Sequence, residues 1–290
     1  MLVNHALQKR NNVRVLGRGS HTLIFAHGFG SEQSAWRHQV AAFQDRYRIV
    51  LFDHVGCGGS DLDAYSPKRY DSLRRYAQDL LELCDALHLS GCTLVGHSLS
   101  GMVGLLAAVA EPQRFQQLVF VKASPRYLND ASTGYHGGFE QEQLNGLYAA
   151  MASNFAVWAM GFAPHAMGNP EQPELGQEFS RTLSAMRPDI ALATARMIFQ
   201  SDHRADLPLL KVPTLILQSG DDLAVPNEVG HYMARHIPRA TLVPIEARGH
   251  LPHLSAPKAV NSAIDTYLSA SRMPRQPGEP KGWLARLTAR

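Results

Sequence analysis

Residues 92–101 limit the possible folds of this chain more than any other part of the sequence. In this segment a short apolar run at 92–95 is followed by Gly-His-Ser-Leu-Ser, and an apolar, helix-like segment continues over 102–110. This order is typical of a nucleophile elbow, in which a strand, a sharp strained turn and a helix follow one another. We therefore expect Ser98 at the tip of the turn, with its backbone in a crowded conformation.

Small residues flank Ser98 on both sides, as a turn of this kind requires. Gly96 and Ser100 occupy these positions, where larger side chains would collide with the neighbouring strand and helix. The usual pattern is Gly-x-Ser-x-Gly, so Ser100 is a departure, but serine is nearly as small as glycine and we expect the turn to survive. Serine-rich turns are also common elsewhere. The motif therefore predicts a nucleophile only if the chain also supplies a base, an acid and an oxyanion hole.

Length and composition indicate one globular core with an insertion. The chain has 290 residues, which is long for one domain and short for two, and 45% of them are hydrophobic against 18% charged, as in ordinary enzymes. No apolar run reaches the ~20 residues of a membrane span, and residues 1–12 lack the apolar centre of a signal peptide. The three cysteines, Cys57, Cys84 and Cys92, are scattered and favour reduced thiols, so we expect a cytoplasmic protein.

The net charge of +3 is concentrated at the end of the chain. Residues 271–290 hold five basic residues and one acid, and removing them from totals of 28 and 25 leaves 23 basic against 24 acidic residues. A nearly neutral body carries no electrostatic sign of nucleic-acid binding, and the 14 histidines show no metal-ligand spacing. The tail composition predicts disorder; a basic membrane anchor carrying Trp283 and Leu284 is the alternative.

Strand and helix signals alternate through the first half of the chain. Strands are expected at 13–16, 22–26, 48–52, 92–95 and 118–122, and helices at 36–43, 76–87 and 102–110. Such alternation predicts an α/β fold with a mostly parallel central sheet flanked by helices on both faces. The glycine-rich loop 53–61 has no following lysine, so we interpret it as a structural turn and not as a phosphate site.

The alternation stops at residue 127 and resumes at about residue 205. Between these points the sequence contains helix-like segments rich in aromatic residues and methionine. We expect this insertion to cover the sheet edge where the catalytic loops gather and to act as a lid, with a minority of its aromatic side chains facing an apolar cavity. The predicted organisation is a two-part core at 1–126 and 205–270, a helical lid at 127–204, and a basic tail at 271–290.

The second part of the core supplies the remaining members of a catalytic triad. Strands are expected at 214–218 and 241–245, and helices at 227–236 and 258–270. Asp221 and Asp222 follow the first of these strands, and His250 follows the second. Serine, aspartate and histidine thus occur in the chain order of the α/β-hydrolases.

In that arrangement His250 would accept the proton of Ser98 as general base, and a carboxylate on its other ring nitrogen would stabilise the imidazolium. Adjacent residues in an extended segment point to opposite sides, so only one of Asp221 and Asp222 can be the acid, and the spacing leaves both candidates open. Other histidines compete for the role of base. His97 lies beside Ser98 and His27 ends a strand, so both are expected to support the backbone, and His253 is expected to pack beside His250.

Two backbone N–H groups are expected to form the oxyanion hole. Gly28 and Gly30 flank Phe29 and allow a tight turn after the strand at 22–26. In hydrolases with this order of motifs, that loop supplies one donor and the residue after the nucleophile supplies the other. We assign the donors to Phe29 and Leu99, since a helix that begins at Leu99 also directs its N-terminal N–H groups at the site. The alternative is a plain glycine-rich turn between strand and helix.

Longer motifs extend the argument beyond the triad. The chain resembles the α/β-hydrolase subfamily that joins the bacterial RsbQ-type stress-response regulators to the plant karrikin and strigolactone receptors. The resemblance runs from about residue 12 to residue 268, and its lid motifs are more specific than its triad motifs. The matching stretches are 27–30, 96–100, 123–130, 137–142, 177–183, 186–190, 199–202, 222–226 and 249–254.

The resemblance implies roles for further residues. It implies that the acid lies four positions before Pro226, which is Asp222, and it makes Ser100 ordinary, because the plant receptors look the same there. It also implies a lid of four helices arranged in a V and no cofactor. Family pocket positions fall on Phe29, Tyr127, Phe139, Leu147, Trp158, Phe162, Ile198 and Leu223. The chain departs from the family around 134–136, where it is slightly longer, and after residue 268.

These inferences predict a serine hydrolase that acts on a small apolar ester, butenolide or lactone. Family members hydrolyse such compounds slowly, and many signal through a protein partner that contacts the lid, so the same chemistry could serve a slow ligand sensor. The alternatives are an RsbQ-like regulator that activates a partner phosphatase, and a cofactor-free haloperoxidase-like enzyme or carbon–carbon bond hydrolase. A dehalogenase is disfavoured, because it would carry aspartate in place of Ser98.

Overall fold

A seven-stranded sheet forms the centre of the molecule, in a computed structural model that describes residues 5–270. Its strand order is β1-β3-β2-β4-β5-β6-β7. The strands are β1 (Arg14–Leu16), β2 (Thr22–Ala26), β3 (Arg48–Phe52), β4 (Cys92–His97), β5 (Phe115–Val121), β6 (Thr214–Gly220) and β7 (Ala240–Arg248). The edge strand β1 is antiparallel to β3, and the remaining pairs are parallel. The predicted α/β fold with a mostly parallel sheet is confirmed.

Helices cover both faces of the inner strands, and successive side chains of a strand point to opposite faces. In β2, Ile24 packs into the core on the side of α3 and α4, whereas Leu23 and Phe25 pack on the side of α2 and α11. This explains why the inner strands are mostly apolar. The core helices are α1 (His5–Asn11), α2 (Arg37–Phe43), α3 (Leu73–Ala86), α4 (Leu99–Ala110), α9 (Asn227–His236), α10 (Pro252–Ser255) and α11 (Pro257–Ala270).

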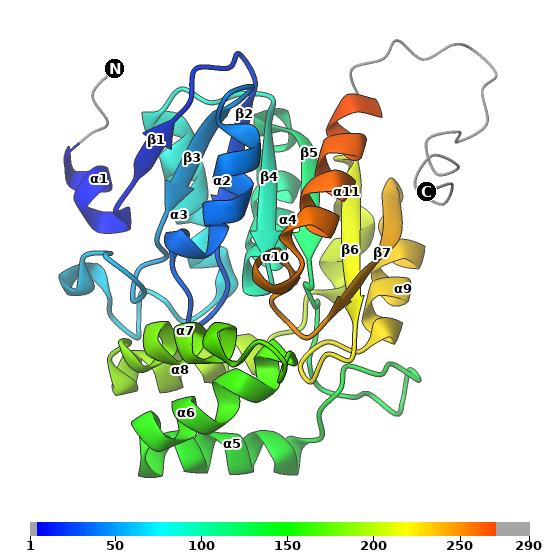
Figure 1. Ribbon diagram of the computed structural model, residues 1–290. Coiled ribbons are helices and arrows are strands. Elements are labelled where there is room, and N and C mark those ends of the chain that lie inside the picture. The colour runs from blue at the N-terminus through cyan, green and yellow to red at the C-terminus, as the bar shows by residue number, and fades with distance from the viewer. Residues whose placement is uncertain (1–4, 271–290) are drawn as a thin grey trace.

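An all-helical insertion follows β5 and covers the carboxyl ends of the parallel strands (Figure 1). It consists of α5 (Gln141–Ser153), α6 (Phe155–Met167), α7 (Pro173–Ser184) and α8 (Pro188–Phe199). Three short bridges, such as Leu128 with Phe139, lie near these helices. The predicted helical lid is confirmed as an insertion, while its borders at 127 and 204 and its V shape stay predictions.

Local sequence signals begin and end the helices of the insertion. Glu140 and Gln143 form a capping box at the start of α5, and the Asn154 side chain accepts from the N–H of Val157 at the start of α6. Helix α6 ends at Gly168, whose φ of 69° lies in the left-handed region. Helices α7 and α8 both begin with proline at their first position.

The structure differs from the predicted elements at several ends. Helix α1 (His5–Asn11) lies in a segment for which the sequence predicted no element. The predicted helix at 36–43 is a 3-10 turn, Gln33–Trp36, followed by α2, and α3 begins at Leu73, before the predicted start. The tail prediction, including Trp283 and Leu284, lies outside the described residues. Within 5–270, no helix is long and apolar enough to cross a membrane.

Candidate active site

Ser98 lies in a strained turn between β4 and α4. Its φ of 55° and ψ of −120° are unusual for a residue with a side chain. The turn is possible because Gly96 lacks a Cβ, which would otherwise lie 2.5 Å from the carbonyl oxygen of Ser100. A hydrogen bond of 2.9 Å from the Ser98 N–H to the carbonyl of Val121 fixes the turn to the end of β5. The strand–turn–helix order predicted from the sequence is present.

The hydroxyl of Ser100 forms two buried hydrogen bonds, which glycine could not form at this position. It donates to the carbonyl oxygen of His27 at 2.5 Å and lies 2.6 Å from Nε2 of His54. Because its one hydrogen is directed at His27, the hydroxyl oxygen accepts a hydrogen bond from the Nε2–H of His54. Burial keeps His54 uncharged by lowering its pKa well below the usual range. Sequence reasoning missed His54, since no motif marks its contact with the elbow.

Ser98, His250 and Asp222 form one hydrogen-bonded chain. The Ser98 hydroxyl donates to Nε2 of His250 at 2.8 Å, and Nδ1 of His250 donates to Oδ2 of Asp222 at 2.9 Å. Asp221 is exposed, with a φ of 45°, whereas the side chain of Asp222 has no exposed surface. The structure therefore brings Asp222, and not Asp221, to the histidine.

The environment of Asp222 favours its ionised form. Burial acts to raise the pKa of this carboxyl group, but His250, the ammonium of Lys122 and the N–H of Ala224 outweigh burial and lower the pKa to about 2. The Ala224 N–H lies 2.7 Å from Oδ1 and the Lys122 ammonium 3.1 Å from Oδ2. Sequence reasoning missed Lys122. Its one signal was a lysine at the end of an otherwise apolar strand.

The competing histidines surround the triad without a place in the hydrogen-bonded chain. His97 donates from Nε2 to the backbone carbonyl of His250 at 2.7 Å, which supports the loop that carries the base. His253 stacks on Trp36 with 4.5 Å between the ring centroids. His27 accepts the N–H of His54 at 3.0 Å. Burial lowers the pKa of all three competing rings, to about 3 for His253, so they are neutral.

The loop after β2 lies directly against the nucleophile. A Cβ on Gly28 would overlap with Nδ1 of His97 and would lie 3.2 Å from the Cβ of Ser98, so only glycine permits this approach. Gly30 adopts a φ of 72° and turns the chain away again. Leu99 is the first residue of α4, next to the nucleophile. The N–H groups of Phe29 and Leu99 thus belong to segments in contact with Ser98, and their role as oxyanion donors stays a prediction.

Aromatic side chains from the core and the insertion meet beside Ser98. The hydroxyl of Tyr127 lies 3.4 Å from the Ser98 hydroxyl, and the side chain of Tyr127 is buried. Phe199, at the end of α8, packs against both Tyr127 and Phe139, with ring centroids 5.0 and 5.6 Å apart. Phe199 belongs to the matching stretch 199–202, but it was not among the predicted pocket residues, because its place in the cluster depends on how α8 packs.

The other predicted pocket residues differ in burial. Trp158 stacks on Phe162 with 4.9 Å between centroids. Leu223 is 52% exposed and lies in the loop that carries Asp222. Ile198 is buried in the same apolar cluster as Tyr127, and this cluster is bordered by the partly buried side chains of Phe29, Phe139, Leu147, Trp158 and Phe162. The assignment of these residues to a substrate pocket stays a prediction.

Other candidate chemistry has less support within residues 5–270. No group of histidine, cysteine and carboxylate side chains among them has the arrangement of a metal site. Cys57, Cys84 and Cys92 are free and buried. Burial raises the pKa of the Cys57 thiol to about 12, which disfavours the thiolate form that a nucleophile needs.

Comparison with known proteins identifies the family. Residues 23–263 match the model of the alpha/beta hydrolase family. The chain belongs to this family. It is 46% identical to karrikin insensitive 2 receptor CA of Petunia hybrida, over 88% of this chain and 94% of the relative. It is 43% identical to strigolactone esterase D14 of Arabidopsis thaliana, over 87% and 94%. The predicted resemblance to the karrikin and strigolactone receptors is confirmed.

A solved structure supports the same fold. The hydrolase olei00960 from Oleispira antarctica superimposes with a TM-score of 0.88 at 35% identity, covering 91% of this chain and 96% of that protein. An esterase from Exiguobacterium antarcticum superimposes with a TM-score of 0.81 at 20% identity, which shows the fold alone. The helical insertion is thus part of a known alpha/beta-hydrolase architecture.

Proposed function

We propose that this protein is an esterase-type serine hydrolase for a small apolar ester, butenolide or related lactone. The observation that carries the proposal is the hydrogen-bonded chain from Ser98 through His250 to Asp222, with distances of 2.8 and 2.9 Å. A serine hydroxyl is a weak nucleophile by itself and needs such a base to react. The family relatives named as strigolactone esterases support the same class of substrate.

The reaction begins with attack of the Ser98 oxygen on the substrate carbonyl carbon while His250 takes the hydroxyl proton. Asp222 stabilises the imidazolium and holds the ring in the tautomer with its proton on Nδ1. Collapse of the tetrahedral intermediate breaks the ester bond, and His250 gives its proton to the leaving oxygen. Water then hydrolyses the acyl-enzyme by the same base. Backbone N–H groups of Phe29 and Leu99 would each stabilise the developing oxyanion by about 3–4 kcal/mol.

The surroundings of the nucleophile suit an uncharged substrate. Tyr127, Phe139 and Phe199 pack together beside Ser98, and the rings of Trp158 and Phe162 belong to the same apolar cluster. Apolar walls with a few polar groups are typical of sites for small organic ligands. We infer a cytoplasmic location from the free cysteines, since reduced thiols persist there.

A second function, a slow-turnover ligand sensor, is favoured by a contact between the insertion and the base. The backbone N–H of His250 donates to the carbonyl oxygen of Ala166 in α6 at 2.8 Å. A displacement of His250 during the reaction would therefore act directly on helix α6 of the lid. Relatives named as karrikin receptors support a signalling role. A protein partner, such as the phosphatase of an RsbQ-like pathway, would then contact the lid, where Val157 and Met160 are 58% and 57% exposed.

Pre-steady-state hydrolysis of a chromogenic butenolide and of p-nitrophenyl acetate tests the proposal, with Ser98→Ala as the control. Sustained turnover that disappears in Ser98→Ala supports the esterase. A burst of about one equivalent per site followed by near arrest indicates a trapped acyl-enzyme and favours the sensor. Equal rates for the wild type and Ser98→Ala, or no product from either substrate, would exclude ester hydrolysis by this serine and leave haloperoxidase-like or carbon–carbon bond chemistry to be assayed.

A further inference from the structure

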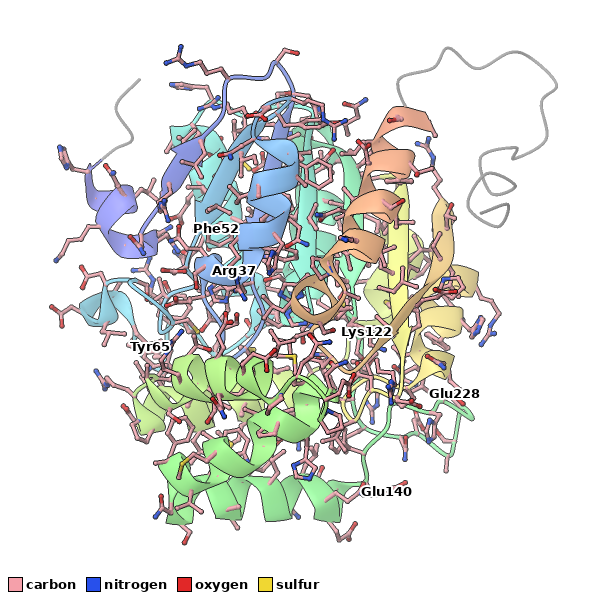
Figure 2. All side chains as sticks on the ribbon, in the orientation of Figure 1. Arg37, Phe52, Tyr65, Lys122, Glu140 and Glu228 are labelled. Atoms are coloured by element: carbon pink, nitrogen blue, oxygen red, sulfur yellow. The ribbon has the colours of Figure 1, made fainter. Side chains whose placement is uncertain are left out.

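Lys122 is a buried lysine directly after β5, at the end of the sheet that faces the insertion (Figure 2). Its side chain has no exposed surface. Its backbone has a φ of 51°, in the left-handed region where glycine is the least strained residue. A lysine held here, against both burial and backbone preference, indicates that its side chain has a role that glycine does not supply.

The surroundings of the Lys122 amine match an ammonium group. Its Nζ lies 3.0 Å from the carbonyl oxygen of Ser219, 3.0 Å from that of Val225 and 3.1 Å from Oδ2 of Asp222. An ammonium carries three hydrogens, and each has an acceptor here. Burial lowers the pKa of Lys122, and the carboxylate of Asp222 counteracts this effect.

The three acceptors belong to the end of β6 and to the loop that connects it to α9. Ser219 in β6 precedes Asp222 and Val225 follows it, so one ammonium connects the end of the strand and the following loop to the carboxylate between them. The Oδ2 atom that receives Lys122 is also the acceptor of Nδ1 of His250, at 2.9 Å. The two nitrogens therefore cannot be more than about 6 Å apart, a range in which one charge alters the protonation of another.

We propose that Lys122 is a positioning residue of the triad that holds Asp222 in place and weakens the affinity of His250 for a proton. This inference rests on the proposed function. A carboxylate alone favours the imidazolium, and a cation on the same oxygen opposes it. His250 thus becomes the neutral base at a lower pH than it would beside Asp222 without Lys122.

Other titratable groups around the pair do not supply a competing charge. His97, at the end of β4, and His253, in α10, are neutral because burial lowers the pKa of both rings. The phenol of Tyr127, after β5, is neutral because burial raises its pKa. Asp221 is next to Asp222 in the same loop, and it is exposed to water. Lys122 is therefore the cation that acts on the buried carboxylate and its histidine.

The test measures the protonation midpoint of the His250 ring by NMR, together with the acid limb of kcat against pH. Lys122→Met removes the charge at nearly the same length, and Lys122→Gly removes it while relieving the left-handed backbone. We expect both midpoints to move to higher pH in both variants, because the opposing charge is lost. In both variants kcat should fall most on the acid side, while KM for an uncharged ester changes little. Lys9→Met is the control, since it removes a surface lysine paired with Asp61 at 2.8 Å, and should leave both midpoints unchanged.

A purely structural role for Lys122 would lower kcat at every pH without moving either midpoint, and that result would overturn the proposal. The ring titration does not need turnover. If the wild type hydrolyses no ester and the ring midpoint still moves, the inference on Lys122 holds and the proposed function fails. Should neither variant fold, the wild type decides: an ammonium resonance for Lys122 at neutral pH supports the proposal, and a neutral amine contradicts it.

Discussion

The sheet core and the α5–α8 insertion are stabilised in different ways. Strand β4 is buried along its whole length and pairs on both sides, so the turn that carries Ser98 has a rigid support. The helices of the insertion are formed by local caps and prolines and pack through apolar side chains. They also leave Val157 and Met160 more than half exposed. The core therefore holds the polar side chains in fixed positions, whereas the insertion presents exposed apolar side chains.

Polar contacts of three kinds connect the sheet core to the α5–α8 insertion: a backbone hydrogen bond, a side-chain hydrogen bond and an ion pair. The backbone of His250 is bonded to Ala166 in α6, as described above. The hydroxyl of Thr182 in α7 donates to the carbonyl oxygen of Gly30 at 2.8 Å, in the loop predicted to supply an oxyanion donor. Arg37 in α2 forms a bidentate pair with Glu178 in α7 at 2.6 and 2.8 Å, near the surface. Two of these contacts reach the loops that carry His250 and Phe29.

The largest expected effect concerns the two adjacent aspartates of the core. Asp222→Asn should lower kcat about 10⁴-fold, because an amide cannot hold His250 in the required tautomer or stabilise the imidazolium. Asp221→Asn is the matched control and should keep nearly the full rate, since its side chain is exposed. Steady-state hydrolysis of p-nitrophenyl acetate measures both. Equal losses of kcat in the two variants would contradict the assignment of Asp222, and not Asp221, as the partner of His250.

The next effect is at the contact between the core and the insertion. A Cβ on Gly249 would overlap with the carbonyl oxygen of Met167, and Gly249 has a φ of 77°. Gly249→Ala should therefore destabilise the protein by more than the ~1–2 kcal/mol of left-handed strain alone, and should lower kcat by displacing His250. Gly134→Ala is the control, because Gly134 has a φ of 66° and nothing within 4 Å of a Cβ. Chemical denaturation compares the two, and equal losses would mean that the contact with α6 has no effect.

A smaller effect is expected inside the core at Ser100. Ser100→Ala leaves the Nε2–H of His54 and the carbonyl of His27 without their shared partner, at a cost of about 1–3 kcal/mol in the free energy of unfolding. We expect kcat to change little, because the substitution leaves Ser98 and His250 unchanged. The main effect should be on the free energy of unfolding. Ser132→Ala removes an exposed hydroxyl that donates to Asp130 and should have little effect. Unchanged stability of Ser100→Ala would show that the two buried groups find other partners.

The smallest effect is expected at the surface pair of the two regions. Arg37→Ala breaks the pair with Glu178, and an exposed pair of this kind contributes about 0.2–1 kcal/mol. We expect Arg37→Ala to have a slightly lower melting temperature than the wild type and an unchanged kcat. This difference in melting temperature should become smaller at high salt, because salt screens the ion pair of the wild type. Differential scanning calorimetry at low and high salt measures this. A large loss of activity would show that the surface pair, and not the buried contacts, couples the insertion to the triad.

Much of the site was predictable because its residues are marked by short local patterns. Ser98 lies in a strand–turn–helix motif, and His250 follows the last strand. The choice between Asp221 and Asp222 came from the family resemblance, since spacing alone leaves both open. His54, Lys122 and Phe199 were missed, because each acts through a partner that is distant in the sequence.

The sequence by itself determined the order of strands and helices, the strand–turn–helix segment that holds Ser98 and the presence of a helical insertion. It did so because apolar periodicity, glycine turns and helix caps act over a few residues. Only the tertiary structure decided that Ser100 binds His54, and that Lys122 shares with His250 an oxygen of Asp222. These contacts join the segments that follow strands β3 to β7 at their carboxyl ends. Burial there requires each polar group to find a partner, whichever part of the chain supplies it.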